Sequence, residues 1–126
     1  MQINLPEIVA EVHEAFMRYE VALNTNDVPV LDATFWDSAE VIRYGIGENL
    51  YGAAEIAAFR AARPSQGLTR SISRTVITTF GHDFATASTL FERASAPGKI
   101  GRQMQSWVRL PEGWRVVAAH ASLIPA

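Results

Sequence analysis

Cysteine is absent from this sequence of 126 residues. Its absence excludes disulfide bonds, thiol nucleophiles and thiolate metal ligands. Histidine is scarce as well: His13, His82 and His120 are the three present, and no two of them have the spacing of a zinc site. We therefore expect no metal site in this protein.

The sequence also lacks long apolar runs and a strong excess of one charge. Its formal net charge is −2, and no basic run occurs, which argues against nucleic acid or an anionic membrane as the partner. No stretch is long and apolar enough to cross a bilayer. The N-terminal segment MQINLPEIVAEVHEAF has no basic region followed by an apolar run, unlike a secretion signal. We therefore expect a cytoplasmic protein.

Apolar residues make up 48% of the chain, enough for one domain over residues 1–126 with a single core. Apolar spacings of three and four predict a helix over residues 8–23, and shorter helices are expected over 28–35 and 53–63. Strands are expected over 36–44, 68–80, 84–95, 99–110 and 114–124, with a short extended piece at 48–51. This order predicts an α+β fold, a cone-shaped barrel with N-terminal helices packed on a curved, mostly antiparallel sheet. Such a fold encloses a cavity between its two layers.

Three arginines lie in the segment RYGIGENLYGAAEIAAFRAAR, which covers residues 43–63. Arg43 follows an apolar strand, Arg60 lies four residues after Ile56, and Arg63 lies four residues after Phe59. On a helix this spacing stacks side chains on one face, so the guanidinium groups lie beside the apolar stripe. Charged groups next to apolar surface need anionic partners, which either acidic side chains or an anionic ligand can supply.

Two interpretations of these arginines compete. Each side chain can lay its stem on apolar surface with its head in water, or pair with Glu48 or Glu55. Because all three arginines fall in one stretch that also contains Tyr44, we favour a pocket for an anionic ligand. Tyr44 is then a further candidate for binding the ligand.

Candidate contacts also occur on the last two strands. Alternation places His120 and Ser122 on one face with Trp114, while Gln105 shares a face of the preceding strand with Trp107. Both faces are mostly apolar, so alternation does not decide which one points inward. His120 is either a hydrogen-bonded core residue or a proton-transfer group. Gln105, His120 and Ser122 are candidates for binding substrate.

Tyr19 lies on the apolar stripe of the first helix and is either a buried anchor or a functional residue. Near the end of the chain stands WRVVAAHAS, residues 114–122, which resembles the last strand of the nuclear transport factor, SnoaL and ketosteroid isomerase superfold. That superfold does not specify a function. A narrower resemblance, to the AtzH-like family that includes the HpxZ proteins, is carried by the segments RYGIGENLYGAAEIAAFRAARP, TVITTFGHDFATASTLF and GRQMQSWVRLPEGWRVVAAHASL.

The resemblance implies a decarboxylating amidohydrolase that converts 1,3-dicarboxyurea to allophanate in cyanuric acid breakdown. It implies no metal or organic cofactor and makes Tyr19 and Arg43 the leading catalytic candidates. Arg43 with Arg60 or Arg63 would hold the substrate carboxylates, because an arginine fork binds a planar carboxylate through two hydrogen bonds. Tyr19 would deliver the proton, with His120 as a second candidate for the relay.

Other functions remain open at this stage. The protein could be a non-catalytic subunit or a small-anion binding module that assists an amidase of oxalurate or cyanurate catabolism. Isomerisation or dehydration in the same cavity would call for a buried carboxylate base, and no Asp or Glu stands clearly on an apolar stripe. A homodimer or homotetramer is expected, with Trp107, Trp114 and Leu123 as candidates to contact a second chain.

Overall fold

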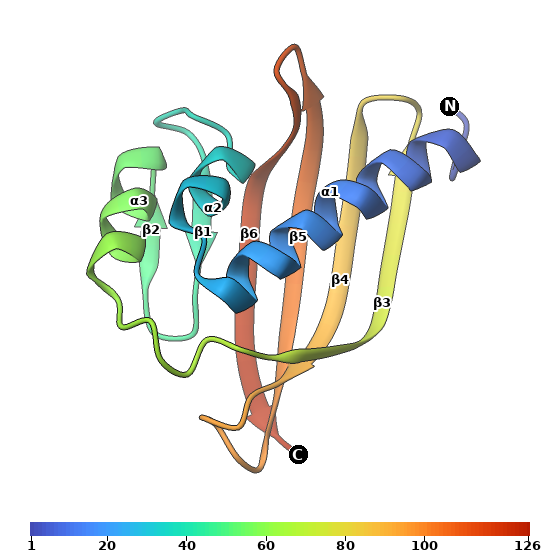
Figure 1. The fold of residues 1–126 in the computed structure, drawn as a ribbon. Helices are drawn as coiled ribbons and strands as arrows, with labels where there is room; N and C mark the ends of the chain where they lie inside the picture. Colours follow the sequence, from blue (N-terminus) through green and yellow to red (C-terminus); the bar gives the residue numbers. More distant parts are fainter.

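The computed structural model describes residues 1–126 as three helices and one six-stranded sheet (Figure 1). The helices are α1 (Pro6–Thr25), α2 (Val28–Thr34) and α3 (Ala53–Ala62). The strands are β1 (Ile42–Tyr44), β2 (Asn49–Tyr51), β3 (Ser71–Phe80), β4 (Phe84–Glu92), β5 (Lys99–Leu110) and β6 (Gly113–Pro125). The predicted α+β class is thereby confirmed. None of the helices is both long and apolar enough to cross a membrane.

The strands follow the order β2-β1-β6-β5-β4-β3 across the sheet. All neighbours pair antiparallel except β1 and β6, which run parallel, so the mostly antiparallel sheet is confirmed. The sheet does not close on itself: β2 and β3 stand at opposite edges and do not pair with each other. The sheet is therefore open, and the predicted closure into a barrel is not observed. Helix α1 lies across one face of this open sheet (Figure 1).

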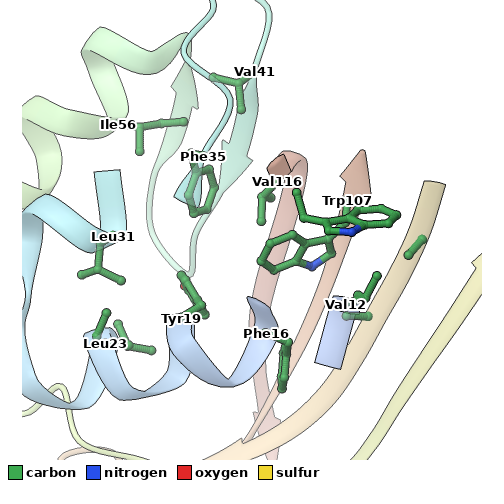
Figure 2. Packing of buried hydrophobic residues seen from close by; sticks show 14 of the residues in the cluster. Val12, Phe16, Tyr19, Leu23, Leu31, Phe35, Val41, Ile56, Trp107 and Val116 are labelled. Atoms are coloured by element: carbon green, nitrogen blue, oxygen red, sulfur yellow. The ribbon is translucent and has the colours of Figure 1, made fainter. Parts of the chain in front are cut away.

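The core lies between α1 and the inner face of the sheet. Val12, Phe16 and Tyr19 of α1 belong to one buried cluster with Trp107 of β5 and Val116 of β6 (Figure 2). Burying a large apolar side chain of this kind stabilises the fold by about 1.5–3 kcal/mol. Tyr19 belongs both to this core and to the wall of the cavity described below.

The core also accounts for two residues that the sequence had suggested for subunit contacts. Trp107 is 0% exposed and Trp114 is 9% exposed within the single chain. Both are buried in the core cluster, so the prediction that they contact a second chain is wrong. Leu123 is partly buried and lines the cavity described below. The homo-oligomer itself stays a prediction.

A β-bulge in β6 decides which residues of this strand face inward. Ser106 pairs with Ala118 but its neighbour Trp107 pairs with Val116, so Val117 is the extra residue. An extra residue reverses the alternation of side chains beyond it. Val116 thus points into the core before the bulge, whereas Ala121, an odd-numbered residue, points inward after it.

Candidate functional site

A cavity of about 300 Å³ opens between the helices and the inner face of the sheet. Tyr19 of α1, Arg43 of β1 and Gln103 of β5 contribute to its wall, together with Phe59 of α3. Among the residues that line it, one is a carboxylate, Glu48, and five are cationic: Arg43, Arg63, Arg70, Arg93 and Lys99. The charge of the cavity therefore favours a small anion.

Tyr19, Arg43 and Arg63, which the sequence singled out, come together at this cavity. Tyr19 is 5% exposed, and no hydrogen bond joins its hydroxyl to another protein group. Arg43 donates to Glu48 at 3.0 Å and lies over the ring of Phe59, with 5.3 Å between the guanidinium carbon and the ring centroid. Arg43 is therefore partly neutralised and held in a defined position.

Arg60 and Gln105 do not join this group. The Arg60 guanidinium donates to Asp32 at 3.0 Å, stacks 4.4 Å from the ring centroid of Phe35, and borders a different cavity. Arg60 thus links α3 to α2 as a structural ion pair. Gln105 is 2% exposed and accepts a hydrogen bond from the Trp107 indole at 3.2 Å, deeper in the core. Gln103, two residues earlier on the same face, reaches the cavity instead.

Tyr44, His120 and Ser122 lie on the outer face of the sheet, away from the cavity. Tyr44 pairs in register with His120, and their rings meet edge to face at 5.8 Å. Ser122 accepts a hydrogen bond from Arg102 at 3.3 Å. We expected these three residues to share a site with the arginines, but they lie on the opposite face of the sheet for two structural reasons. The bulge turns His120 and Ser122 outward, and alternation places Tyr44 opposite its neighbour Arg43.

A buried ion pair that was not predicted from the sequence lies beside the cavity. Glu20 is 4% exposed and receives two hydrogen bonds from Arg70, from Nε at 3.2 Å and from Nη2. A buried carboxylate is therefore present after all, but Arg70 occupies both of its oxygens. The signal was available, because Glu20 follows Phe16 by four residues and so stands on the buried stripe of α1.

Arg93 was also missed, although strand alternation points to it. It follows the buried Phe91 by two residues, and the guanidinium groups of Arg70 and Arg93 lie 4.6 and 4.8 Å from the centroid of the Phe91 ring. Arg93 Nε donates to the backbone carbonyl of Leu68 at 3.2 Å, and Arg93 forms no ion pair. Phe91 thereby supports two cations at the wall of the cavity.

Two of the cavity arginines lie in surroundings that oppose their charge. Burial lowers the pKa of Arg63, and the positive charges of Arg43 and Arg60 lower it further. Burial also lowers the pKa of Arg93, with the charge of Arg70 as the next cause. An anion in the cavity would counter both effects. His, Asp and Glu side chains do not gather in groups of three that could hold a metal ion.

Phe91 also constrains a backbone position on β5. A methyl group at Gly101 would overlap the Phe91 ring, which is 2% exposed and cannot retreat into solvent. We expect Gly101→Ala to lower the free energy of unfolding by about 1–3 kcal/mol, the usual cost of overpacking. The control is Gly47→Ala, because nothing lies within 4 Å of the added methyl group there. Urea unfolding of the two variants measures the difference, and equal stabilities would contradict the prediction.

Solved structures similar to this chain share its fold over nearly its whole length. A protein of unknown function of the DUF3225 family from Pectobacterium atrosepticum is 60% identical, with a TM-score of 0.94, and the match covers 97% of this chain and 94% of that one. A cystatin-like fold protein from Burkholderia xenovorans is 48% identical, with a TM-score of 0.95 and coverage of 100% and 98%. An NTF2-like protein of unknown function from Pseudomonas putida is 16% identical, with a TM-score of 0.74 and coverage of 92% and 86%, and shows the fold alone.

The search of curated proteins found no match. The family model described as AtzH-like matches residues 1–126, the entire chain. This agrees with the resemblance carried by the three segments of the sequence and with the NTF2-like neighbours of the fold. The chain belongs to the AtzH-like family.

Proposed function

We propose that this protein is an enzyme that removes carbon dioxide from a small carboxylated urea, converting 1,3-dicarboxyurea to allophanate. The observation that carries this proposal is the cavity itself, whose wall brings together Arg43, Arg63 and Tyr19. The substrate carries two carboxylates on a flat urea, and arginine forks match planar carboxylates. Membership of the AtzH-like family supports the same substrate class by resemblance.

The reaction needs a proton and a charge clamp. The bond between a urea nitrogen and its carboxylate carbon breaks, its electron pair stays on the nitrogen, and the carboxylate leaves as carbon dioxide. One proton is added to that nitrogen, so a dianion becomes the monoanion allophanate. A phenol carries an O–H group that can donate its proton to the urea nitrogen. Tyr19 takes the role of donor, and solvent returns the proton to it afterwards.

The two clamp residues differ in their protein partners. Arg43 shares its charge with Glu48 at 3.0 Å, while Arg63 forms no ion pair. The carboxylate that stays in the product is held best by the unshared charge of Arg63. The carboxylate that leaves must lose its negative charge, so the partly neutralised Arg43 positions it without holding it as strongly. In this arrangement Arg63 retains the carboxylate of the product, and Arg43 positions the carboxylate that leaves as carbon dioxide.

The proposal is tested by incubating the purified protein with freshly generated 1,3-dicarboxyurea and following allophanate and carbon dioxide. We expect the wild type to exceed the spontaneous rate and Arg43→Ala to lose at least about tenfold, because a charged hydrogen bond contributes about 1.5–3 kcal/mol. The control is Arg102→Ala, since Arg102 lies on the outer face with its Nε on Ser122.

A wild type that only matches the spontaneous rate would overturn the enzymatic proposal for this substrate. Binding of the acid without turnover would then favour the non-catalytic function, a small-anion binding module that assists an amidase. Pull-down of an amidase by the purified protein would distinguish that role.

A further inference from the structure

The Nε and Nη2 atoms of Arg63 are buried and have no hydrogen-bond partner in the protein. These two atoms form one edge of the guanidinium, whose two N–H bonds match the two oxygens of a carboxylate. The same pair of atoms on Arg70 binds both oxygens of Glu20 in this molecule. The chain thus contains an internal example of the contact that the Arg63 edge is shaped to make.

No carboxylate of the protein pairs with Arg63, because Glu48, Glu20 and Asp32 accept hydrogen bonds from other arginines. Glu48 accepts from Arg43 and from the backbone of Gly47, and Glu20 accepts from Arg70. Asp32 accepts from Arg60. Buried donors without partners are costly, and charged ones more so, which is why native proteins rarely keep them without a functional reason.

Gln103 supplies a second donor of this kind in the same cavity. It is 6% exposed, and the nitrogen of its side-chain amide is buried without a partner. Gln105, two residues further on the same face, differs in that its amide oxygen accepts a hydrogen bond from the Trp107 indole in the core. The amide N–H of Gln103 can donate to a carbonyl oxygen, which is the acceptor left to it in a ligand whose carboxylate is bound by Arg63.

We infer that Arg63 and Gln103 form a specificity subsite, in which the Arg63 edge binds a carboxylate and the Gln103 amide binds the carbonyl oxygen of a urea or amide in the same ligand. The subsite selects acids that carry a ureido or amide group over plain carboxylic acids of equal size. It deepens the proposed function, which names the reaction but not the residues that recognise the urea. Binding of a stable acid tests the inference without turnover.

The probe is N-carbamoylglycine, a stable acid with a urea group, and its matched control is 4-methylpentanoate, which has the same number and branching of heavy atoms without the urea. Dissociation constants are measured by titration calorimetry. We expect the wild type to bind N-carbamoylglycine about 3- to 10-fold more tightly, the effect of one neutral hydrogen bond. Gln103→Leu is expected to weaken only N-carbamoylglycine and so to abolish this preference.

Arg63→Gln is expected to weaken both acids at least about tenfold, because both present a carboxylate to the lost charge. The Tm of the ligand-free Arg63→Gln variant should stay equal or rise, since the variant removes a buried charge that lacks a partner. Arg102→Gln, on the outer face, is the control and should change neither dissociation constant. Unaltered binding in Arg63→Gln, or equal weakening of both acids in Gln103→Leu, would overturn the inference.

The two proposals fail in different ways. If the binding pattern holds and 1,3-dicarboxyurea decays only at its spontaneous rate, the subsite stands and the proposed reaction fails. If turnover is found while Arg63→Gln leaves the dissociation constants of both acids unchanged, the proposed reaction stands and the subsite fails.

Discussion

Tyr19→Phe is expected to slow the turnover of 1,3-dicarboxyurea by about 10²- to 10⁴-fold, the usual contribution of a positioned proton donor. The variant removes one oxygen and keeps the ring, whose centroid lies 6.2 Å from that of Phe35 in the core. Because the Tyr19 hydroxyl has no protein partner, its removal breaks no hydrogen bond of the fold. The variant should therefore have a lower kcat and an unchanged free energy of unfolding.

The control for Tyr19→Phe makes the same chemical change on the outer face of the sheet. Tyr51 is 51% exposed and exchanges a hydrogen bond with the Tyr44 hydroxyl at 2.9 Å. Tyr51→Phe should keep wild-type turnover. Steady-state rates of allophanate formation compare the two variants with the wild type. Full turnover in Tyr19→Phe would remove the tyrosine from the mechanism and leave the arginines as a clamp only.

Glu20→Gln is expected to lower the free energy of unfolding by about 3–5 kcal/mol, because it leaves a buried guanidinium without its counter-charge. The side chains of Glu20 and Arg70 are 5% and 2% exposed, so water cannot replace the lost carboxylate. Urea unfolding followed by circular dichroism measures this loss. The effect on stability also reaches the site, because Arg70 lies over the Phe91 ring at the cavity wall.

A matched ion pair on the same helix provides the control for Glu20→Gln. Arg18 and Glu14 also pair, at 2.9 Å, but their side chains are 62% and 75% exposed. Glu14→Gln should change the free energy of unfolding by about 0.5 kcal/mol or less. The double variant Glu20→Leu with Arg70→Met should be more stable than Glu20→Gln, since it removes both charges together. Equal losses in Glu20→Gln and Glu14→Gln would show that burial does not set the strength of the pair.

Part of the candidate site could be predicted from local pattern alone. Arg43 alternates with the buried Val41, and Tyr19 lies on the apolar stripe of α1. Local pattern therefore predicts that both residues lie near apolar surface. Periodicity reports which side of an element is buried. It does not report which charged partner lies across the gap, and for that reason Arg60 and Arg63 looked equivalent. Arg60 has Asp32 as its partner and Arg63 has none.

The inward face of the last strand, β6, could not be predicted from the sequence. Strict alternation from Trp114 would carry His120 and Ser122 to the inner face, but the extra residue Val117 reverses the pattern halfway along β6. Whether a strand holds a bulge depends on its register with the neighbouring strand, which no short-range pattern records. A single inserted residue therefore removed two candidates from the site and put Ala121 in their place.

By itself the sequence determined the α+β class, the helix-then-sheet order and the family, because these depend on periodicity, turn residues and long recognisable segments. It also predicted an anionic ligand, since three arginines of one stretch lie beside apolar residues. The tertiary structure alone decided which of the predicted arginines lacks a protein partner. That outcome depends on contacts between residues far apart in the chain, such as Arg70 with Glu20 and Arg60 with Asp32. Once those pairs form, the edge of Arg63 and the amide of Gln103 are the donors of the cavity wall that are both buried and without a partner.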